Sequence, residues 1–219
     1  MATLIGVDEA GRGCVIGPLV ICAFKINEKH EIELKKMGVK DSKLLAPTTR
    51  NKLYKELIKS KHCLRIIPAT ELTELMNKKI SLNEIEAIKI AECLQELDDN
   101  ETTAFIDSPD ANPKKFAERI KRLAPNLKIK IIAENKADVN HLVASAASII
   151  AKETREMEVT RIKKLVGDFG SGYTSDGKTI VFLKKHYGKN KALNEFIREK
   201  WSTIKNLKTT QVKLGNYFK

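Results

Sequence analysis

The sequence predicts an α/β protein with a mixed five-stranded sheet, flanking helices and a helical C-terminal region. Two β-rich apolar runs near the start, at residues 3–9 and 18–26, suit an antiparallel strand pair. A run at 62–69 supplies a third strand. Two later runs, one ending at Asp107 and one at 128–134, are each followed by a helical stretch. That alternation predicts parallel neighbours in one sheet.

The expected helices follow from their start signals and apolar spacing. Ser81 and Glu84 form a capping box that opens a helix reaching toward residue 98. Pro113 suits the first position of a helix over 113–123. We expect one long helix from Asp138 to about Val166. Shorter helices are expected at 28–37, 47–60, 71–76, from about 174 to 186, and within 189–207.

Length and composition indicate a globular chain. At 219 residues, with 42% hydrophobic and 31% charged residues, it can bury a sizeable core, and neither a disordered nor a membrane-spanning class fits. We expect one folded domain over residues 1–208, in which about 167–208 form a basic helical part. A flexible tail is expected over 209–219.

The charge is strongly positive and unevenly distributed. Lys and Arg number 40 against 28 Asp and Glu, a net charge of +12. Residues 178–219 hold eleven Lys or Arg and only two Glu, so most of the excess lies at the end of the chain. This predicts a polyanionic partner such as nucleic acid. The alternative is a solvated basic face that keeps the protein soluble.

The cysteines and the apolar runs indicate the cellular compartment in which the protein is expected. The four cysteines are Cys14, Cys22, Cys63 and Cys93. Their spacing indicates reduced thiols in a cytoplasmic protein and no zinc site. The apolar run at 14–24 is too short to span a bilayer, and it follows acidic residues, so we expect no targeting segment.

Two adjacent carboxylates, Asp8 and Glu9, close the first strand within the motif GVDEAGRG at residues 6–13. Because side chains alternate faces along a strand, both can meet one ligand only if the strand ends or distorts there. Gly11 and Gly13 permit positive φ and a close ligand, and Arg12 between them can meet a phosphate. A surface turn with two solvated acids is the alternative.

Asp107 and Asp138 occupy equivalent places, each at or just beyond the C-terminal end of a predicted strand. Ligands of open α/β sheets gather at such ends, so these two acids can converge with Asp8 and Glu9. Carboxylates without His or Cys suit Mg²⁺ or Mn²⁺, and two such ions can promote phosphodiester hydrolysis. The set favours a metal-dependent nuclease. Helix N-caps at strand exits are the alternative.

Two further motifs are candidate substrate contacts. In the stretch at 38–45, Ser42 and Lys43 could bond a phosphate, but the spacing alone favours the alternative, an ordinary polar loop. A glycine-rich loop at 167–179 presents Tyr173. His141 is interpreted as a polar residue at a helix start rather than a metal ligand, because no second His or Cys stands at ligand spacing.

Together these motifs resemble the ribonuclease HII family, its archaeal branch in particular. The matching stretches are residues 6–13, 39–45, 105–110, 133–152 and 167–176. The resemblance implies a ribonuclease H-like fold and an endoribonuclease that hydrolyses the RNA strand of RNA–DNA hybrids. It also implies cleavage 5′ of ribonucleotides embedded in duplex DNA by two-metal-ion catalysis, leaving 3′-hydroxyl and 5′-phosphate ends. Its implied roles are primer removal and ribonucleotide excision in DNA replication and repair.

The resemblance also implies roles for single residues. The implied catalytic and metal-site acids are Asp8, Glu9, Asp107 and Asp138. Backbone groups at Gly11, Arg12 and Gly13 would read the ribose 2′-OH. Lys43 would contact phosphate, and Tyr173 would pack on the sugar of the next deoxynucleotide and enforce cleavage at an RNA–DNA junction. The chain departs from the family pattern at Asn135, His141, Leu142 and Thr174.

The end of the chain carries a second resemblance. Gln211, Leu214, Tyr217 and Phe218 have the spacing Q-x-x-L-x-x-Y-F, which resembles the sliding-clamp-binding box of replication and repair proteins. Such a box places the glutamine in a polar pocket and the apolar residues in a groove of the clamp. The alternative is that the aromatic residues dock on this protein's own core.

Two other functions remain open at this point. A basic adaptor without catalysis could bridge nucleic acid and a replication partner. Metal-dependent phosphotransfer on a small nucleotide would need a phosphate-binding fingerprint, and the sequence has none. Nothing in the sequence demands more than a monomer.

Overall fold

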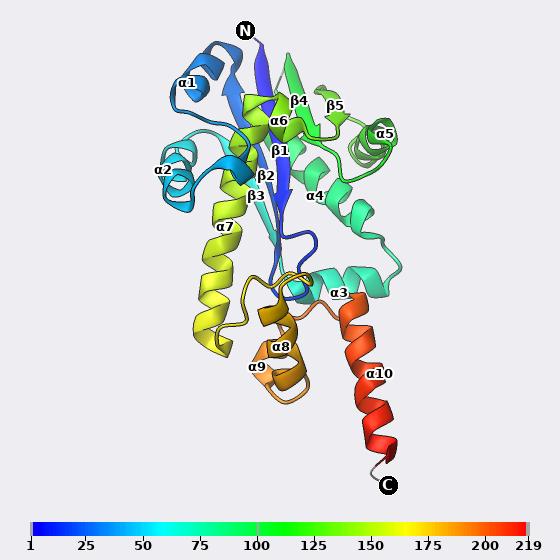
Figure 1. Ribbon diagram of the computed structural model, residues 1–219. Coiled ribbons are helices and arrows are strands. Elements are labelled where there is room, and N and C mark those ends of the chain that lie inside the picture. Colours follow the sequence, from blue (N-terminus) through cyan, green and yellow to red (C-terminus); the bar gives the residue numbers. More distant parts are fainter. Residues whose placement is uncertain (1, 100, 218–219) are drawn as a thin grey trace. The chain divides into compact units, whose positions relative to one another are not determined.

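Five strands form one mixed sheet in the computed structural model, which describes residues 2–99 and 101–217 and only the backbone of residues 210–217 (Figure 1). Their order is β3-β2-β1-β4-β5. β1 pairs antiparallel with β2 and parallel with β4, and β4 pairs parallel with β5. The predicted mixed sheet is confirmed. The strands are β1 (Thr3–Ala10), β2 (Leu19–Asn27), β3 (His62–Ile67), β4 (Thr102–Asp107) and β5 (Lys130–Glu134).

The first strand does not end at its two acids, and that expectation is wrong. β1 stays in register with β2 through Glu9↔Ile21 and Ala10↔Val20, so β2 continues to satisfy its backbone groups. Only the pairing with β4 stops earlier, at Val7. In a regular strand, Asp8 and Glu9 direct their side chains to opposite faces of the sheet.

The chain divides into two compact units. The first, which we call the sheet unit, comprises Met1–Ala10, Val20–Ile66 and Ser81–Arg155. The second, the helical unit, comprises Gly11–Leu19, Ile67–Ile80 and Glu156–Lys219. Two segments from the first half of the chain, 11–19 and 67–80, belong to the helical unit. The predicted domain over 1–208, with a basic helical part at about 167–208, stays a prediction.

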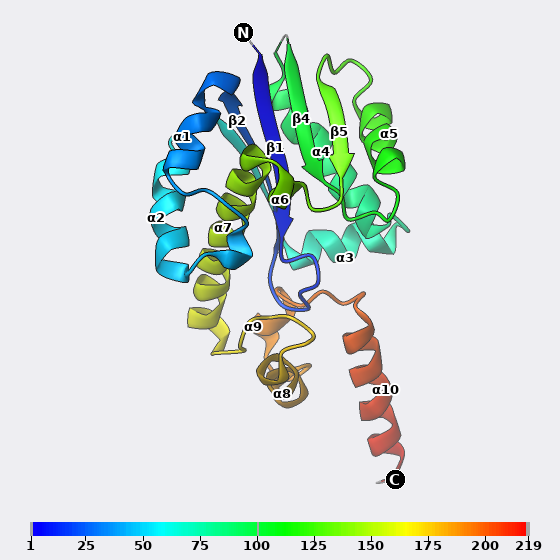
Figure 2. The same cartoon turned by 45° about the horizontal axis from the view of Figure 1, so that its top comes forward.

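The helices of the sheet unit agree with their sequence signals. Ser81 accepts a hydrogen bond from Glu84 N at 3.2 Å and caps α4, and Pro113 opens α5 as predicted. In Figure 2, α6 lies in front of the strands and α4 behind them. The helical segments are η1 (Glu28–His30), α1 (Glu31–Lys36), η2 (Ser42–Leu44), α2 (Pro47–Leu57), α4 (Leu82–Leu97), α5 (Pro113–Leu123) and α6 (Ala137–Asn140).

A long helix, α7 (Leu142–Val166), packs unusually close to the central strand. A Cβ atom on Gly6 of β1 would stand 2.0 Å from the main-chain carbon of Val143. Only glycine fits there. The small residues of α7, among them Ala146 and Ala147, are fully buried in the same core as Phe24 of β2. These small residues let α7 lie close to the sheet.

The helix predicted to run unbroken from Asp138 is interrupted. α6 ends at Asn140, His141 has extended backbone angles (φ −128°, ψ 123°), and α7 begins at Leu142. Asp138 therefore lies on a single separate turn and not on the first turn of α7. The predicted uninterrupted helix is wrong at this point.

The helical unit has its own apolar core. It includes Ile16, Phe169, Leu183 and Ile197, together with Val159 from the second half of α7. Its other helices are α3 (Ala69–Asn77), α8 (Gly177–His186), α9 (Lys191–Asn194) and α10 (Ser202–Tyr217).

The last helix runs past the expected start of the tail. α10 continues without a break to Tyr217, so Gln211, Leu214 and Tyr217 lie on helical backbone, while Phe218 lies outside the described residues. A separate tail at 209–219 stays a prediction. Within the described chain, no helix combines the length and apolarity needed to cross a membrane.

Candidate active site

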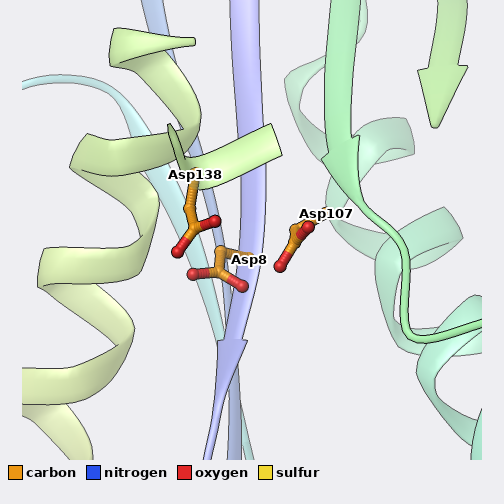
Figure 3. A group of neighbouring side chains, drawn as sticks. All are labelled: Asp8, Asp107 and Asp138. Atoms are coloured by element: carbon orange, nitrogen blue, oxygen red, sulfur yellow. The ribbon is translucent and has the colours of Figure 1, made fainter. Parts of the chain in front are cut away.

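Three of the four predicted acids converge in the sheet unit. Asp8 of β1, Asp107 at the end of β4 and Asp138 of α6 each offer a carboxylate oxygen, and these oxygens lie within 4.8 Å of one another. Figure 3 shows the three side chains pointing toward a common centre. Asp8 and Asp138 are almost fully buried, at 6% and 1% exposure. Buried like charges at such spacing need a cation or protons.

Strand register explains how two of these acids meet. Val7 of β1 pairs with Ile106 of β4, so the next residue on each parallel strand, Asp8 and Asp107, are neighbours across the sheet. Asp138 arrives from a different element. The backbone turns through left-handed Lys136 (φ 64°) after β5, and the Ala137 N–H donates to Asp107 Oδ1 at 3.0 Å.

Glu9 is not part of the three-carboxylate group in the described structure. It follows Asp8 directly on β1. Its negative charge still acts on its neighbour, because it is the second cause, after burial, of the raised pKa of Asp8. The assignment of Glu9 as a metal ligand stays a prediction.

The acids are held in an environment that disfavours their charge. Burial, followed by the Glu9 carboxylate, raises the pKa of Asp8 well above its ordinary value, and Asp107 and Asp138 add to the effect. Burial also raises the pKa of Asp107, against the hydrogen bond from Ala137. A divalent cation would relieve this repulsion.

The donor set of this cluster fits a hard cation. The three residues supply only carboxylate oxygens, with no imidazole or thiolate in the group. Oxygen-only sites suit Mg²⁺ or Mn²⁺, which also coordinate substrate phosphates. The prediction of a metal site at this edge of the sheet is consistent with the cluster.

Lys43 lies beside the acids, whereas Ser42 is inside the fold. Lys43 Nζ is 3.3 Å from Asp138 Oδ2, and its side chain is 70% exposed. Partial burial acts to lower the pKa of Lys43, but the charge and hydrogen bond of Asp138 outweigh it, so the pKa is raised. Ser42 is 1% exposed, and its hydroxyl lies 2.9 Å from that of Ser148. It is thus not on the surface where a phosphate contact was expected.

Two serines of α7 support the cluster and were missed in the sequence. Ser148 hydrogen-bonds the Asp8 side chain and lowers its pKa, against the larger effect of burial. The Ser145 hydroxyl donates to the main-chain oxygen of Asp138 at 2.5 Å. Both belong to the run of small residues by which α7 packs against the sheet. The available signal was that serines interrupt this alanine run at residues 145 and 148, a spacing that puts both on one helix face.

The remaining candidates are gathered within the helical unit. Cys14 forms an isolated β-bridge with Tyr173, and Val15 N donates to Gly172 O at 2.8 Å. A Cβ on Gly13 would lie 3.7 Å from the Tyr173 ring. The glycine-rich loop thus lies against the residues that follow Gly11 and Arg12.

Arg198 holds the main chain of residues 12–17 through side-chain hydrogen bonds. It is fully buried, its Nε donates to Gly17 O at 2.9 Å and its Nη1 donates to Arg12 O at 2.9 Å. Its guanidinium carbon also lies 4.9 Å from the centre of the Trp201 ring. Sequence reasoning missed Arg198, because nothing distinguishes it from the other basic residues near the C-terminus.

Two carboxylates hold the glycine-rich loop in shape. Asp176 accepts hydrogen bonds from Ser171 N at 2.6 Å and from Lys178 N at 2.9 Å, and it caps α8. Asp168 accepts from Lys178 Nζ at 2.5 Å and Gly170 N at 3.1 Å. These bonds stabilise the ionised acids and lower the pKa of each well below the ordinary value.

Comparison with known proteins identifies the family. A family model described as ribonuclease HII matches residues 5–204. Ribonuclease HII of Methanocaldococcus jannaschii is 46% identical over an alignment that covers 96% of this chain and 98% of the relative.

Two solved structures are similar in fold and sequence. Ribonuclease H2 from Pyrococcus horikoshii superposes with a TM-score of 0.85 at 39% identity, covering 95% of this chain and 98% of that one. A ribonuclease HII from Archaeoglobus fulgidus, solved in a complex with PCNA, gives a TM-score of 0.81 at 37% identity, covering 91% and 95%. With a family match over most of its length, the chain belongs to the ribonuclease HII family and is a ribonuclease H hydrolase.

Proposed function

We propose that the enzyme hydrolyses the RNA strand of RNA–DNA hybrids and cuts 5′ of ribonucleotides embedded in duplex DNA, leaving 3′-hydroxyl and 5′-phosphate ends. Its biological roles would be primer removal and ribonucleotide excision. The observation that carries the proposal is the buried group of Asp8, Asp107 and Asp138 in a chain of this family.

The carboxylates would bind metal. Asp8, Asp107 and Asp138, with Glu9 beside them, would hold Mg²⁺ or Mn²⁺, which when bound would activate a water and stabilise the leaving oxygen. The raised pKa of Asp8 and of Asp107 means that metal binding competes with protons at these side chains. Lys43, which contacts Asp138, would exchange that contact for one with a substrate phosphate.

The helical unit would bind the nucleic acid. The main chain of Gly11, Arg12 and Gly13 would approach the ribose 2′-OH, which distinguishes RNA from DNA. Tyr173 lies against Gly13 and would pack on a sugar of the substrate. The eleven basic residues at 178–219 would neutralise phosphates, and binding should weaken as salt increases.

The metal-site assignment is tested with Asp107→Asn. This change keeps the size of the side chain but removes one negative charge from the cluster. We expect cleavage of a duplex with one embedded ribonucleotide to fall by at least about 10³-fold, since removing one charge-stabilising group at an active site costs on that order. Affinity for the uncleaved hybrid should stay unchanged.

Asp110→Asn is the matched control, because this half-buried acid lies three residues further along and outside the cluster. It should cleave at the wild-type rate. Normal turnover by Asp107→Asn at ordinary Mg²⁺ concentrations would contradict the assignment, and equal losses in both variants would indicate a general effect of the loop.

We also propose that the C-terminal residues bind a DNA sliding clamp. Two observations support this: the sequence Q-x-x-L-x-x-Y-F at Gln211, Leu214, Tyr217 and Phe218, and the similarity to a ribonuclease HII that was solved in a complex with PCNA. An apolar residue and two aromatic residues on one helical turn are typical anchors for a groove on a partner.

The clamp proposal is tested with the double variant Tyr217→Ala/Phe218→Ala. Binding to an archaeal ring-shaped clamp, measured by calorimetry, should be lost, whereas hybrid cleavage and melting temperature should not change. Asn216→Ala, at a position of the box that the spacing leaves unspecified, should bind as the wild type does. A double variant that binds the clamp normally and melts several degrees earlier would show that the two aromatic residues stabilise this protein itself.

A further inference from the structure

The interruption between α6 and α7 carries a side-chain network that the proposed mechanism does not use. His141 occupies the interruption in an extended conformation. Its Nε2 lies 2.8 Å from Glu134 Oε1, and because a carboxylate only accepts, the imidazole donates this hydrogen bond. Asn140 Nδ2 donates to the same oxygen at 3.0 Å. Two consecutive residues at the interruption are therefore tied to the last residue of β5.

Glu134 is placed by the sheet beside the acidic cluster. It is the register partner of Asp107 on the neighbouring parallel strand, so both side chains leave the same face. Glu134 is nevertheless not in the three-carboxylate group of the described structure. Its bonds to Asn140 and His141 direct this carboxylate to the α6–α7 interruption.

His141 also contacts β4. Its ring stacks on Phe105 with the two centroids 3.8 Å apart and the planes 20° from parallel. Phe105 precedes Asp107 by two residues, which puts the two side chains on one face of β4. A single side chain thus links the interruption to the two strands that end beside the cluster.

The main chain transmits this anchoring to Asp138. The His141 N–H donates to Ala137 O at 2.9 Å, and the Ala137 N–H donates to Asp107 Oδ1 at 3.0 Å. Asp138 lies within this turn. Asp8 and Asp107 repel its carboxylate. Its attractive partner among the described ion pairs, Lys43, has a side chain that is 70% exposed, so the turn contributes to holding Asp138 in place.

We propose that His141 is a positioning residue for the acidic cluster: by joining Glu134 and Phe105 it fixes the α6 turn and keeps Asp138 where it can share a cation with Asp8 and Asp107. This inference rests on the proposed metal-binding role of those acids. The imidazole touches none of the reacting atoms and acts only through the turn.

The test measures metal binding without substrate. Mn²⁺ alone is titrated by calorimetry into the full-length chain and its variants, and kcat and KM for a hybrid are measured separately. Mutation of a residue that supports a metal ligand typically weakens metal affinity 10–100-fold. We expect His141→Ala to weaken Mn²⁺ binding about tenfold and His141→Phe, which keeps the stack, to weaken it less.

Kinetics distinguish positioning from a general loss of structure. His141→Ala should lower kcat at limiting Mn²⁺, leave KM for the hybrid unchanged, and recover its rate when Mn²⁺ is raised about tenfold. His30→Ala is the matched control, because His30 Nδ1 also faces a glutamate, Glu33, at 3.1 Å in the sheet unit but outside the cluster. It should change neither affinity nor rate.

The outcomes separate this inference from the metal site itself. Wild-type Mn²⁺ affinity in folded His141→Ala overturns the positioning role. Should that variant fail to fold, His141→Phe decides, and wild-type affinity there overturns it equally. If the wild-type chain binds Mn²⁺ no more tightly than Asp107→Asn does, the metal site is wrong, and the inference falls with it.

Discussion

The acidic cluster of the sheet unit and the glycine-rich loop of the helical unit treat their carboxylates in opposite ways. In the sheet unit, burial and neighbouring acids raise the pKa of Asp8 and Asp107. In the helical unit, N–H donors lower the pKa of Asp168 and Asp176. A carboxylate surrounded by donors stabilises a loop. One surrounded by other acids is repelled by them, and a bound cation would relieve that repulsion, so the contrast separates the acids proposed to bind metal from those that stabilise a loop.

The two units also position their candidate residues by different means. Register between adjacent parallel strands brings Asp8 next to Asp107. Among the described residues of the helical unit, no paired strands align the candidate residues in this way. Buried Arg198 instead holds the main chain at Arg12 and Gly17, far away in sequence, through two hydrogen bonds.

The sharpest test of this comparison is a methyl group added in each unit. In Gly6→Ala the new Cβ would stand 2.0 Å from the main chain of Val143, so α7 must move away from β1. Overpacking of this kind costs about 1–3 kcal/mol and sometimes more. We expect the largest loss of unfolding free energy here, measured with urea, together with loss of cleavage.

Gly177→Ala is the control in the helical unit. Its Cβ would meet nothing within 4 Å, at the first residue of α8. Stability should stay within about 0.5 kcal/mol of the wild type, or rise slightly, because alanine favours helix. A tolerated Gly6→Ala would mean that α7 is not held tightly against the sheet.

The second test replaces the guanidinium group of buried Arg198, which donates two hydrogen bonds at once. Arg198→Lys keeps the charge, but one ammonium cannot reproduce the two-armed geometry that serves Gly17 O and Arg12 O. An unsatisfied buried acceptor costs about 1–3 kcal/mol, and the unfolding free energy should fall by that amount. Affinity for the hybrid should fall too, because the loop that carries Gly11 to Gly13 loses its support.

Arg161→Lys controls for the chemistry of the substitution. Arg161 is an exposed residue of α7, paired only with Glu158 in the described ion pairs, and its side chain is 55% exposed. Exposed pairs contribute about 0–1 kcal/mol. If both lysine variants behave alike, Arg198 is not an anchor of the loop.

Much of the sheet unit could be predicted because its signals are local and periodic. Pro113 and Ser81 start helices where expected, and strand ends at Asp107 and Glu134 follow from apolar runs. The break at His141 could not be predicted. It depends on a hydrogen bond to Glu134 and a stack on Phe105, contacts that exist only once β4 and β5 are paired.

The site shows the same limit. The convergence of Asp8, Asp107 and Asp138 follows from topology and was expected. The roles of Ser148 and Arg198 were not, because neither residue has a local pattern that sets it apart. The sequence predicts which acidic residues lie at the ends of neighbouring strands. The residues that hydrogen-bond and support the site cannot be predicted in this way, because their contacts form only in the tertiary structure.

The third test concerns Tyr173, the aromatic residue of the glycine-rich loop. An aromatic ring that stacks on a nucleic acid contributes about 1–3 kcal/mol of binding free energy. The rate of cleavage at an RNA–DNA junction should therefore fall about ten- to a hundredfold in Tyr173→Ala. Tyr173→Phe should retain most of the rate. Equal losses on all-RNA hybrids and on junction substrates would refute a role of Tyr173 in reading the junction.

The smallest expected effect is the pH dependence contributed by Asp176. Hydrogen bonds from Ser171 lower its pKa below the ordinary value of 3.8. An acid whose pKa is lowered in the folded state adds stability above its unfolded pKa and loses it as pH falls toward the folded pKa. The melting-temperature difference between wild type and Asp176→Ala should therefore be full at pH 6 and shrink below about pH 4.

Asp99 offers a matched control in the sheet unit, since Lys25 and Thr102 lower its pKa in the same direction. Asp99→Ala should show the same shrinking difference without changing the cleavage preference, whereas Asp176→Ala should also weaken junction cleavage by loosening the loop that carries Tyr173. A difference that stays constant from pH 6 to pH 3 would show that Asp176 stabilises the loop through its shape and not through its charge.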